Sequence, residues 1–246
     1  MPRLVERQYR GHSQGRESNM ARARLLWILC VVAGLAMIAA MVAMGQVPHQ
    51  VACDGNASLR PILRFEWLTS AAQFQQFFGA EPCRSQLALA MDGVDRIDTM
   101  AYIPAFTLFQ LFAAFAMRAN GRLAALFVIN AALIAAGCDL LEDHRLFSLS
   151  AIARMREAIE PAGLEQLFWF VRVKFGLLAL AAIALGRLVG ARSGKGWRIT
   201  SWAMMGSGAV GLAGLVMPQL LAPGIGAAWA LLFGVALVRV VRPQAA

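Results

Sequence analysis

The chain alternates long apolar runs with shorter polar segments, and the length of those runs is the first structural signal. Six runs are evident, at residues 25–44, 99–117, 123–140, 167–187, 199–221 and 224–241. At about 1.5 Å per residue, ~20 helical residues cross a bilayer core of ~30 Å. The pattern predicts an all-α fold, a polytopic transmembrane helix bundle of about six spans. This bundle, 25–246, forms a single domain behind a polar tail, 1–24.

The longest polar segment, 45–98, is predicted to be a partly helical loop. Ser70 can cap a helix over the sequence AAQFQQFF, and Gly79 can end it. Trp67 and three phenylalanines give this helix an apolar side. Such a helix can lie in the membrane interface, cover the mouth of the bundle, or pack on the ends of the spans. The last of these is the expectation.

Composition supports the membrane prediction. The chain is 59% hydrophobic and 15% charged, with a mean hydropathy of +0.59. Soluble domains contain roughly a quarter charged residues. The net charge of +9 raises the question of nucleic acid. We expect no nucleic-acid partner, because the basic residues flank apolar runs and no RNA-binding or zinc-finger motif occurs.

The placement of the charges predicts the orientation in the membrane. The short segments 118–122, 187–198 and 239–242 are basic, whereas most acids lie in 45–98 and 139–166. Basic loops stay in the cytoplasm, so both termini are expected there, with 45–98 outside. The tail is basic as well, with Arg3, Arg7, Arg10, Arg16, Arg22 and Arg24. The first run is an uncleaved anchor or a cleaved secretory signal, and its length favours the anchor, since signal cores are ~7–15 residues long.

The cysteines fit an outward-facing loop. Cys53 and Cys83 both lie in 45–98, where an oxidising compartment permits a disulfide between them. Cys30 and Cys138 lie in or near the apolar runs and are expected to be packed thiols.

Two acidic clusters mark the outer ends of the second and third runs. The first contains Asp95 and Asp98, followed by Tyr102 on the same helical face. The second contains Asp139, Glu142 and Asp143, which also share a face. Because the two runs form an antiparallel hairpin, Asp98 and Asp139 are expected at the same membrane level.

Two cations, Arg172 and Lys174, lie near the start of the fourth run, at the level of the acids. Charges inside a membrane are rare and usually pair, so Arg172 is the expected counter-charge for Asp139. Deeper in the hairpin, Gln110 and Asn130 are expected to hydrogen-bond across helices.

Three readings of the acids remain open. They form a structural ion pair with Arg172, they hold a cation, or they belong to a catalytic or lipid-head-group site. For the second reading the ligands are Asp98, Asp139 and Glu142. Carboxylates favour a hard cation such as Mg²⁺ or Ca²⁺ over zinc.

Three short motifs carry a resemblance. FEWLTS begins at Phe65, DTMAYIP begins at Asp98, and DLLED begins at Asp139. Between residues 65 and 143 the sequence resembles a bacterial multi-pass inner-membrane family that has no assigned activity. The resemblance implies a polar site made of Glu66, Asp98, Tyr102, Asp139 and Glu142, and an inner-membrane location. It implies no reaction.

The leading functional hypothesis is non-enzymatic. The protein binds or passes a lipid, amphiphile or cation at an outward-facing acidic site, or supports a membrane complex. The alternative is a metal-assisted hydrolase or transferase acting on lipid head groups, with Tyr102 or His144 moving protons. An ion-coupled transporter ranks last, because the sequence places only amides deep in the bilayer. Beyond the lipid bilayer, the expected partner is a membrane protein or a second copy, bound through the glycine-rich segment 206–214.

Overall fold

The computed structural model describes residues 2–56, 58–157, 159–191 and 194–242. Within these ranges every regular element is a helix, so the predicted all-α bundle is confirmed. The α-helices are α1 (Pro2–Gly45), α2 (Pro61–Glu66), α3 (Ala71–Phe78), α4 (Cys83–Ile97), α5 (Ile103–Met117), α6 (Arg122–Met155), α7 (Pro161–Gly190), α8 (Lys195–Ala213) and α9 (Leu221–Val241). A π-helical turn η1 (Asp98–Tyr102) joins α4 to α5, and the short 3-10 turns are η2 (Arg118–Asn120) and η3 (Pro218–Leu220).

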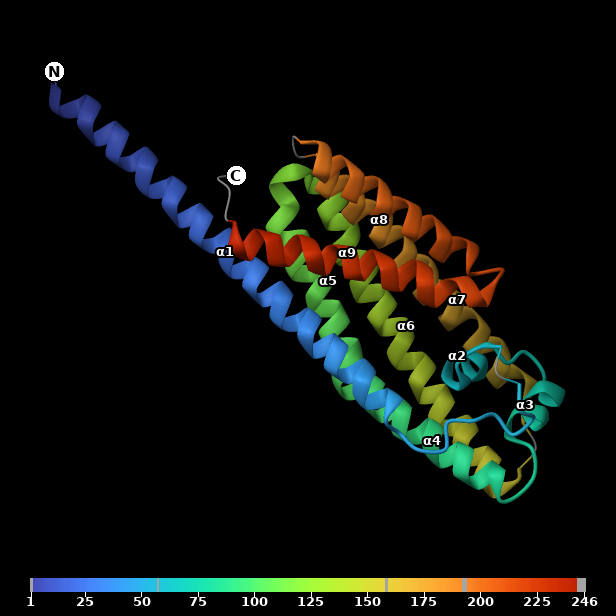
Figure 1. Cartoon of the computed structure of the whole chain (residues 1–246). Coiled ribbons are helices and arrows are strands. Elements are labelled where there is room, and N and C mark those ends of the chain that lie inside the picture. The colour runs from blue at the N-terminus through green and yellow to red at the C-terminus, as the bar shows by residue number, and fades with distance from the viewer. Residues whose placement is uncertain (1, 57, 158, 192–193, 243–246) are drawn as a thin grey trace.

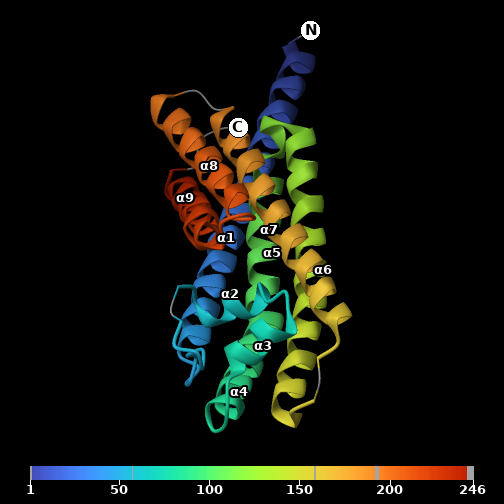
Figure 2. The ribbon, with the colours of Figure 1, turned by 90° about the vertical axis from the view of Figure 1, so that its right-hand side faces the viewer.

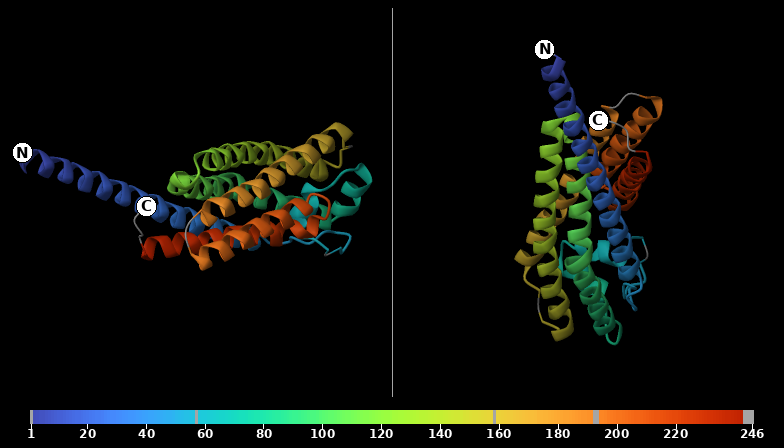
Figure 3. Two further views of the ribbon diagram at one scale, coloured as in Figure 1. Left: turned by 90° about the horizontal axis from the view of Figure 1, so that it is seen from above. Right: turned by 90° about the vertical axis from the view of Figure 1, so that its left-hand side faces the viewer.

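The long helices run side by side along an elongated molecule (Figure 1). The start of α1 and the end of α9 lie at one end of it, and α2 and α3 lie at the opposite end (Figure 2). Seen from the other side, α1 projects beyond its neighbours at the N-terminal end (Figure 3).

Two of the long continuous helices, here called rods and numbered in chain order, are much longer than the sequence predicted. The second rod runs through α4, η1 and α5 from Cys83 to Met117, and the third rod is α6, from Arg122 to Met155. The expectation that the acids mark helix ends is therefore wrong. Asp98 and Asp139 lie near the middle of their rods, because both helices continue past the apolar runs as amphipathic helices with one buried face.

Within the described residues, five helical stretches are long and apolar enough to cross a membrane. They are Met20–Gly45, Cys83–Asn120, Arg122–Met155, Ala162–Gly190 and Pro218–Val241. The predicted run 199–221 is instead divided. α8 ends at Ala213 and α9 begins at Leu221, with Pro223 in the first turn of α9, where its missing N–H leaves no helical bond unmade. α8 packs lengthwise between α7 and α9 (Figure 1).

Two separate hydrophobic cores occupy the two ends of the molecule. The larger one, the bundle core, is formed by side chains of α1, α5, α6, α7, α8 and α9. The smaller one, the cap core, is formed by α2, α3 and α4 together with the cap-side ends of α6 and α7. Outside the bundle core the helices expose large apolar side chains such as Leu108, Phe127 and Ile134, as lipid-facing surfaces do.

The cap contains the predicted amphipathic helix. Ser70 accepts a hydrogen bond from the Gln73 backbone N–H, and Gly79 ends α3 with a positive φ of 57°. Phe77 and Phe78 are buried against Phe65, and Phe74 packs on Phe78. The helix therefore packs on the ends of the long rods, in agreement with the expectation.

A disulfide joins Cys53 to Cys83, the first residue of α4. It ties the loop before α2 to the second rod. A Cβ at Gly79 would lie 2.6 Å from the Cys53 Cβ, so only glycine fits at the end of α3 beside this bond.

The glycine-rich segment of α8 is used for packing inside the chain. A Cβ at Gly208 would lie 2.7 Å from the backbone oxygen of Ala179 in α7, and one at Gly214 would lie 2.8 Å from Leu221. Small residues here let three helices approach closely. Gly206 has open space beside it, so self-association through this segment stays a prediction.

Candidate functional site

A layer of buried charged residues separates the two cores. On the second rod, Asp95 and Asp98 lie between Val94 of the cap core and Ile103 of the bundle core. On α6 and α7 as well, the buried charged residues lie between side chains of the cap core and side chains of the bundle core. We define the charged layer as Glu66, Asp95, Asp98, Asp139, Glu142, Asp143 and Lys174, all of them buried.

Lys174 is the cation at the centre of this layer. Its Nζ lies 2.7 Å from Oδ1 of Asp139 and 2.7 Å from Oε2 of Glu142. Oε2 of Glu66 is 3.9 Å away. A buried ammonium is stable only when carboxylates surround it in this way.

The expected pairing of Asp139 with Arg172 is wrong. The Arg172 guanidinium lies over two aromatic rings, 3.4 Å from the centroid of Phe168 and 4.4 Å from that of Trp67. Lys174 shares a buried helical face with Val171 and Leu178, whereas Arg172 points to the neighbouring face. Arg172 is thus partly exposed beside aromatic rings, whereas Lys174 is buried in the interior.

Three carboxylates in the layer approach one another closely. One oxygen each from Asp98, Asp139 and Asp143 lies within 4.8 Å of the others. Asp143 also accepts a short hydrogen bond from the Thr99 hydroxyl, which fixes its rotamer. The predicted ligand set was Asp98, Asp139 and Glu142, whereas the carboxylates that group most closely are those of Asp98, Asp139 and Asp143. Glu142 contacts Lys174.

The π-helical turn places Asp98 in this group. Its backbone carbonyl accepts from the N–H of Ile103, five residues on, instead of four. This wider turn accommodates Pro104, which has no N–H to donate. Turns of this kind recur at functional sites in proteins.

Glu66 enters the layer from the cap, at the end of α2. Burial raises the pKa of its carboxyl from 4.5 to about 7. The positive charge of Lys174 lowers this pKa in part, and the negative charge of Asp139 raises it further. Glu66 therefore keeps its proton to a higher pH than an exposed glutamate does.

Several buried polar atoms have no hydrogen-bond partner among the described residues. They include both carboxylate oxygens of Asp95, Oδ1 of Asp98 and the side-chain amide of Gln110. The expected bonds between helices from Gln110 and Asn130 are not found in this part of the chain. Asn130 instead donates to the Leu126 carbonyl of its own helix. His144 is exposed on the face of α6 that points away from the charged layer.

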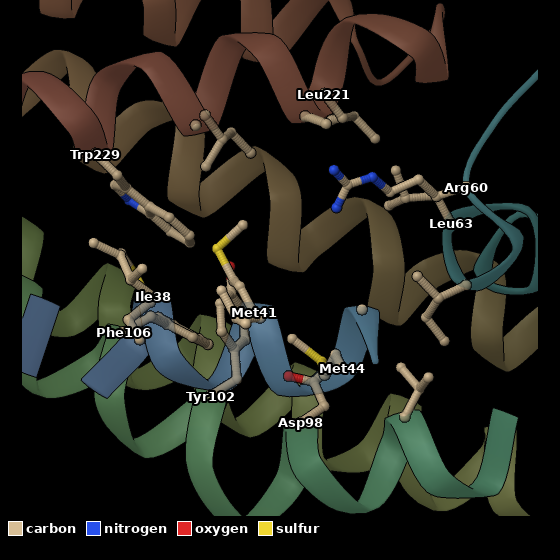
Figure 4. Close-up of a pocket in the computed structure, with 18 of the residues that line it drawn as sticks. Ile38, Met41, Met44, Arg60, Leu63, Asp98, Tyr102, Phe106, Leu221 and Trp229 are labelled. Carbon is tan, nitrogen blue, oxygen red and sulfur yellow. The ribbon is translucent and has the colours of Figure 1, made fainter. Parts of the chain in front are cut away.

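A cavity of about 920 Å³ lies between α1 and α9 and reaches the charged layer. Figure 4 shows α1 along one side, α9 along the other, and Arg60 pointing in from the segment before α2. Most lining side chains are apolar, among them Met41, Phe106 and Trp229. The polar part of the lining includes Glu66, Asp98, Tyr102, Asp139 and Lys174.

The cavity exists because α1 and α9 diverge towards the cap. They touch where a Cβ at Gly34 would lie 2.6 Å from the Phe233 ring, and they separate beyond that contact (Figure 1). Ile38, Met41 and Val42 at the rim are partly exposed. The cavity therefore opens sideways between the two helices.

Two contributors to this site were not among the predicted site residues. Lys174 was expected at the level of the acids but not as their partner, although its spacing from Val171 and Leu178 places it on the buried face. Arg60 carried no recognisable signal, because its position depends on how the loop folds over the rods. The chain matches no protein-family model, no curated protein and no solved structure.

Proposed function

We propose that this protein is a multi-pass inner-membrane protein that binds a lipid or similar amphiphile in the cavity between α1 and α9, and holds it or passes it on. The apolar part of the ligand lies along the walls, and its polar head meets the charged layer. The observation that carries the proposal is the cavity itself, lined mostly by apolar side chains and in part by buried carboxylates and Lys174.

The size and opening of the cavity support this function. Ligand pockets commonly enclose ~300–1,000 Å³, and the cavity has about 920 Å³. Its lateral rim carries exposed apolar side chains of α1, which would face acyl chains in a bilayer. An amphiphile could therefore enter from the membrane without crossing water.

The proposed orientation places the cap outside the cytoplasm. The basic segments lie at the opposite end from the cap, in keeping with the positive-inside rule. The disulfide in the cap also belongs in an oxidising compartment. The charged layer then lies near the outer boundary of the membrane.

The second candidate function is metal-assisted cleavage or transfer of a lipid head group. The grouping of Asp98, Asp139 and Asp143 favours it, because three carboxylates can hold a catalytic cation. Tyr102 lines the cavity and is placed to exchange a proton. His144 is too exposed for that role.

The proposal is tested by filling the cavity. Gly226 of α9 lines the cavity, and an added Cβ there would meet no atom within 4 Å. We expect Gly226→Leu to reduce the lipid that co-purifies with the protein several-fold, because the side chain occupies the place of the acyl chain. Mass spectrometry of the extracted lipid measures this loss.

The matched control is Gly234→Leu on the same helix. Gly234 is also exposed and has open space, but it does not line the cavity. Both changes raise helix propensity by about 1 kcal/mol, so stability should not separate them. Equal lipid content in the two variants would disprove the cavity as the binding place. Lipid recovered without its head group would favour the second candidate.

A further inference from the structure

The three aspartates of the charged layer have the spacing of ligands to one ion. Two oxygens bound to the same Ca²⁺ at about 2.4 Å can be up to about 4.8 Å apart. The oxygens of Asp98, Asp139 and Asp143 all lie within 4.8 Å of one another, so at most small side-chain shifts would bring all three to one ion. Mg²⁺, with bonds of ~2.1 Å, sets a tighter limit and demands a more regular geometry.

The charges in the layer do not balance. Six carboxylates surround Lys174, whose ammonium contacts Asp139 and Glu142. Oδ1 of Asp98 is buried and has no hydrogen-bond partner in the described parts of the chain. Buried like charges at this spacing are strongly unfavourable unless a proton or a cation lies between them.

We propose that Asp98, Asp139 and Asp143 bind a hard divalent cation, with Ca²⁺ as the best fit. Carboxylate oxygens are the ligands that Ca²⁺ prefers. Thr99 donates to Asp143 and holds it in place, as outer partners of metal ligands commonly do. Lys174 contacts Oδ1 of Asp139, so Oδ2 is the oxygen expected to bind the ion.

The cavity gives this ion an entry path and free positions. Asp98 and Asp139 both line it, so part of the coordination sphere faces the open space. Ca²⁺ usually takes six to eight oxygens, and three carboxylates leave room for ligand or water oxygens.

If the cavity binds an amphiphile as proposed, the cation site indicates the chemical class of the amphiphile's head group. A bound cation favours a head group with anionic oxygens, such as a phosphate. Arg60, which points into the cavity in Figure 4, offers a second positive group at the mouth. The bound lipid is therefore expected to carry a phosphate in its head group.

Isothermal titration of Ca²⁺ into chelator-treated protein in a non-ionic detergent tests the site. We expect one saturable site, weakened about tenfold or more in Asp98→Asn and Asp143→Asn, because each removes one ligand charge. Asp98→Asn should fold normally, since it neutralises a buried carboxylate that lacks a partner. Its melting temperature without Ca²⁺ should equal or exceed that of the wild type, and Ca²⁺ should no longer raise it.

A control variant separates this site from other acids. Asp54→Asn, which lies in the exposed loop, should keep Ca²⁺ binding. Glu142→Gln, which removes a partner of Lys174, is compared with Asp143→Asn to test the ligand set. No saturable binding by the wild type would overturn the proposal, as would binding that Asp98→Asn leaves unchanged. Loss of binding in Glu142→Gln but not in Asp143→Asn would also overturn the ligand set.

Lipid content is measured separately on chelated and Ca²⁺-loaded protein. Phosphate-bearing lipid that increases with Ca²⁺ supports the head-group class. Lipid that is bound equally in both states contradicts that class while the proposed function stands. Ca²⁺ binding with no lipid in either state contradicts the proposed function and leaves the metal site in place.

Discussion

Glu66 is the acid of the charged layer that comes from outside the long rods. It approaches Lys174 at 3.9 Å, whereas Asp139 and Glu142 approach at 2.7 Å. Burial is the largest influence on its carboxyl and raises its pKa to about 7. The protonated form is therefore favoured in the folded protein at pH values where the unfolded chain would be ionised.

This shift predicts a pH dependence of stability. A carboxyl with a raised folded-state pKa contributes stability below about pH 4.5, and the contribution falls as the pH rises to about 7. Above that pH the loss levels off at up to about 3 kcal/mol. The comparison is between wild type and Glu66→Gln, both treated with chelator, by thermal unfolding from pH 4 to 8.

At low pH the two proteins should unfold at similar temperatures, because protonated glutamate and glutamine are alike in shape and charge. Above neutral pH the Glu66→Gln variant should be the more stable one. Curves that run parallel across the whole range would show that Glu66 does not titrate in the folded protein.

Sequence patterns predicted the grouping of the acids correctly, but Arg172 was predicted as their counter-charge in place of Lys174. The common face of Asp139, Glu142 and Asp143 followed from spacing alone, and all three are buried. The choice between Arg172 and Lys174 depended on which face of α7 turns inwards. That orientation is set by packing between helices, which a single sequence records only weakly.

Among the helices, the second rod and α6 extend through both cores. The cap-side parts of these rods, near residues 83–95 and 146–155, are amphipathic, so hydropathy did not extend the predicted spans into them. The bundle-side parts of both rods are apolar all round, so hydropathy predicted them as spans. Ser70 and Gly79 gave the bounds of α3 correctly, because caps are local signals.

The Cys53–Cys83 disulfide is predicted to stabilise the cap more than the bundle. It closes a loop with a sequence separation of 30 residues. Chain-entropy arguments give about 3–4 kcal/mol for such a loop. In Cys53→Ser/Cys83→Ser, hydrogen exchange should become faster in residues 46–82 and stay unchanged in α8 and α9.

Cys138→Ser is the control for this experiment, because Cys138 is a free thiol on α6. It should leave exchange in the cap as in the wild type. If the double variant exchanges faster throughout α8 and α9 as well, the two cores unfold as one unit and the expected independence of the cap is lost.

At the scale of the whole molecule, one end exposes apolar side chains that suit lipid, and the other end exposes polar side chains that suit water. Bundle helices expose leucine, isoleucine and phenylalanine, whereas the cap exposes residues such as Arg96, Glu165 and Gln166. The charged layer lies at the change between the two surfaces. The all-α membrane-bundle class could be predicted from the sequence. The cap could not be predicted as one unit, because its helices come from distant parts of the chain.

The proposed orientation predicts where thiol reagents can reach. In a Cys138→Ser background, Gln166→Cys in the cap should react in intact cells with a maleimide that cannot cross the inner membrane. Ala119→Cys, exposed in the turn at the opposite end, should react only after the inner membrane is permeabilised. Labelling in the reverse order would invert the topology.

The π-helical turn at residues 98–102 has a consequence for how this chain can vary in length. One residue more or less rotates one part of an α-helix by about 100° relative to the other. The wide turn already holds one residue more than an α-helical turn, so deleting Met100 would relax it to a regular helix with little rotation of α4. A single-residue deletion in the regular part of the rod is not absorbed in this way. It would rotate the two parts against each other, and Met91 and Asp95, now buried, would leave their present neighbours. The second rod is therefore constrained in length everywhere except at this turn.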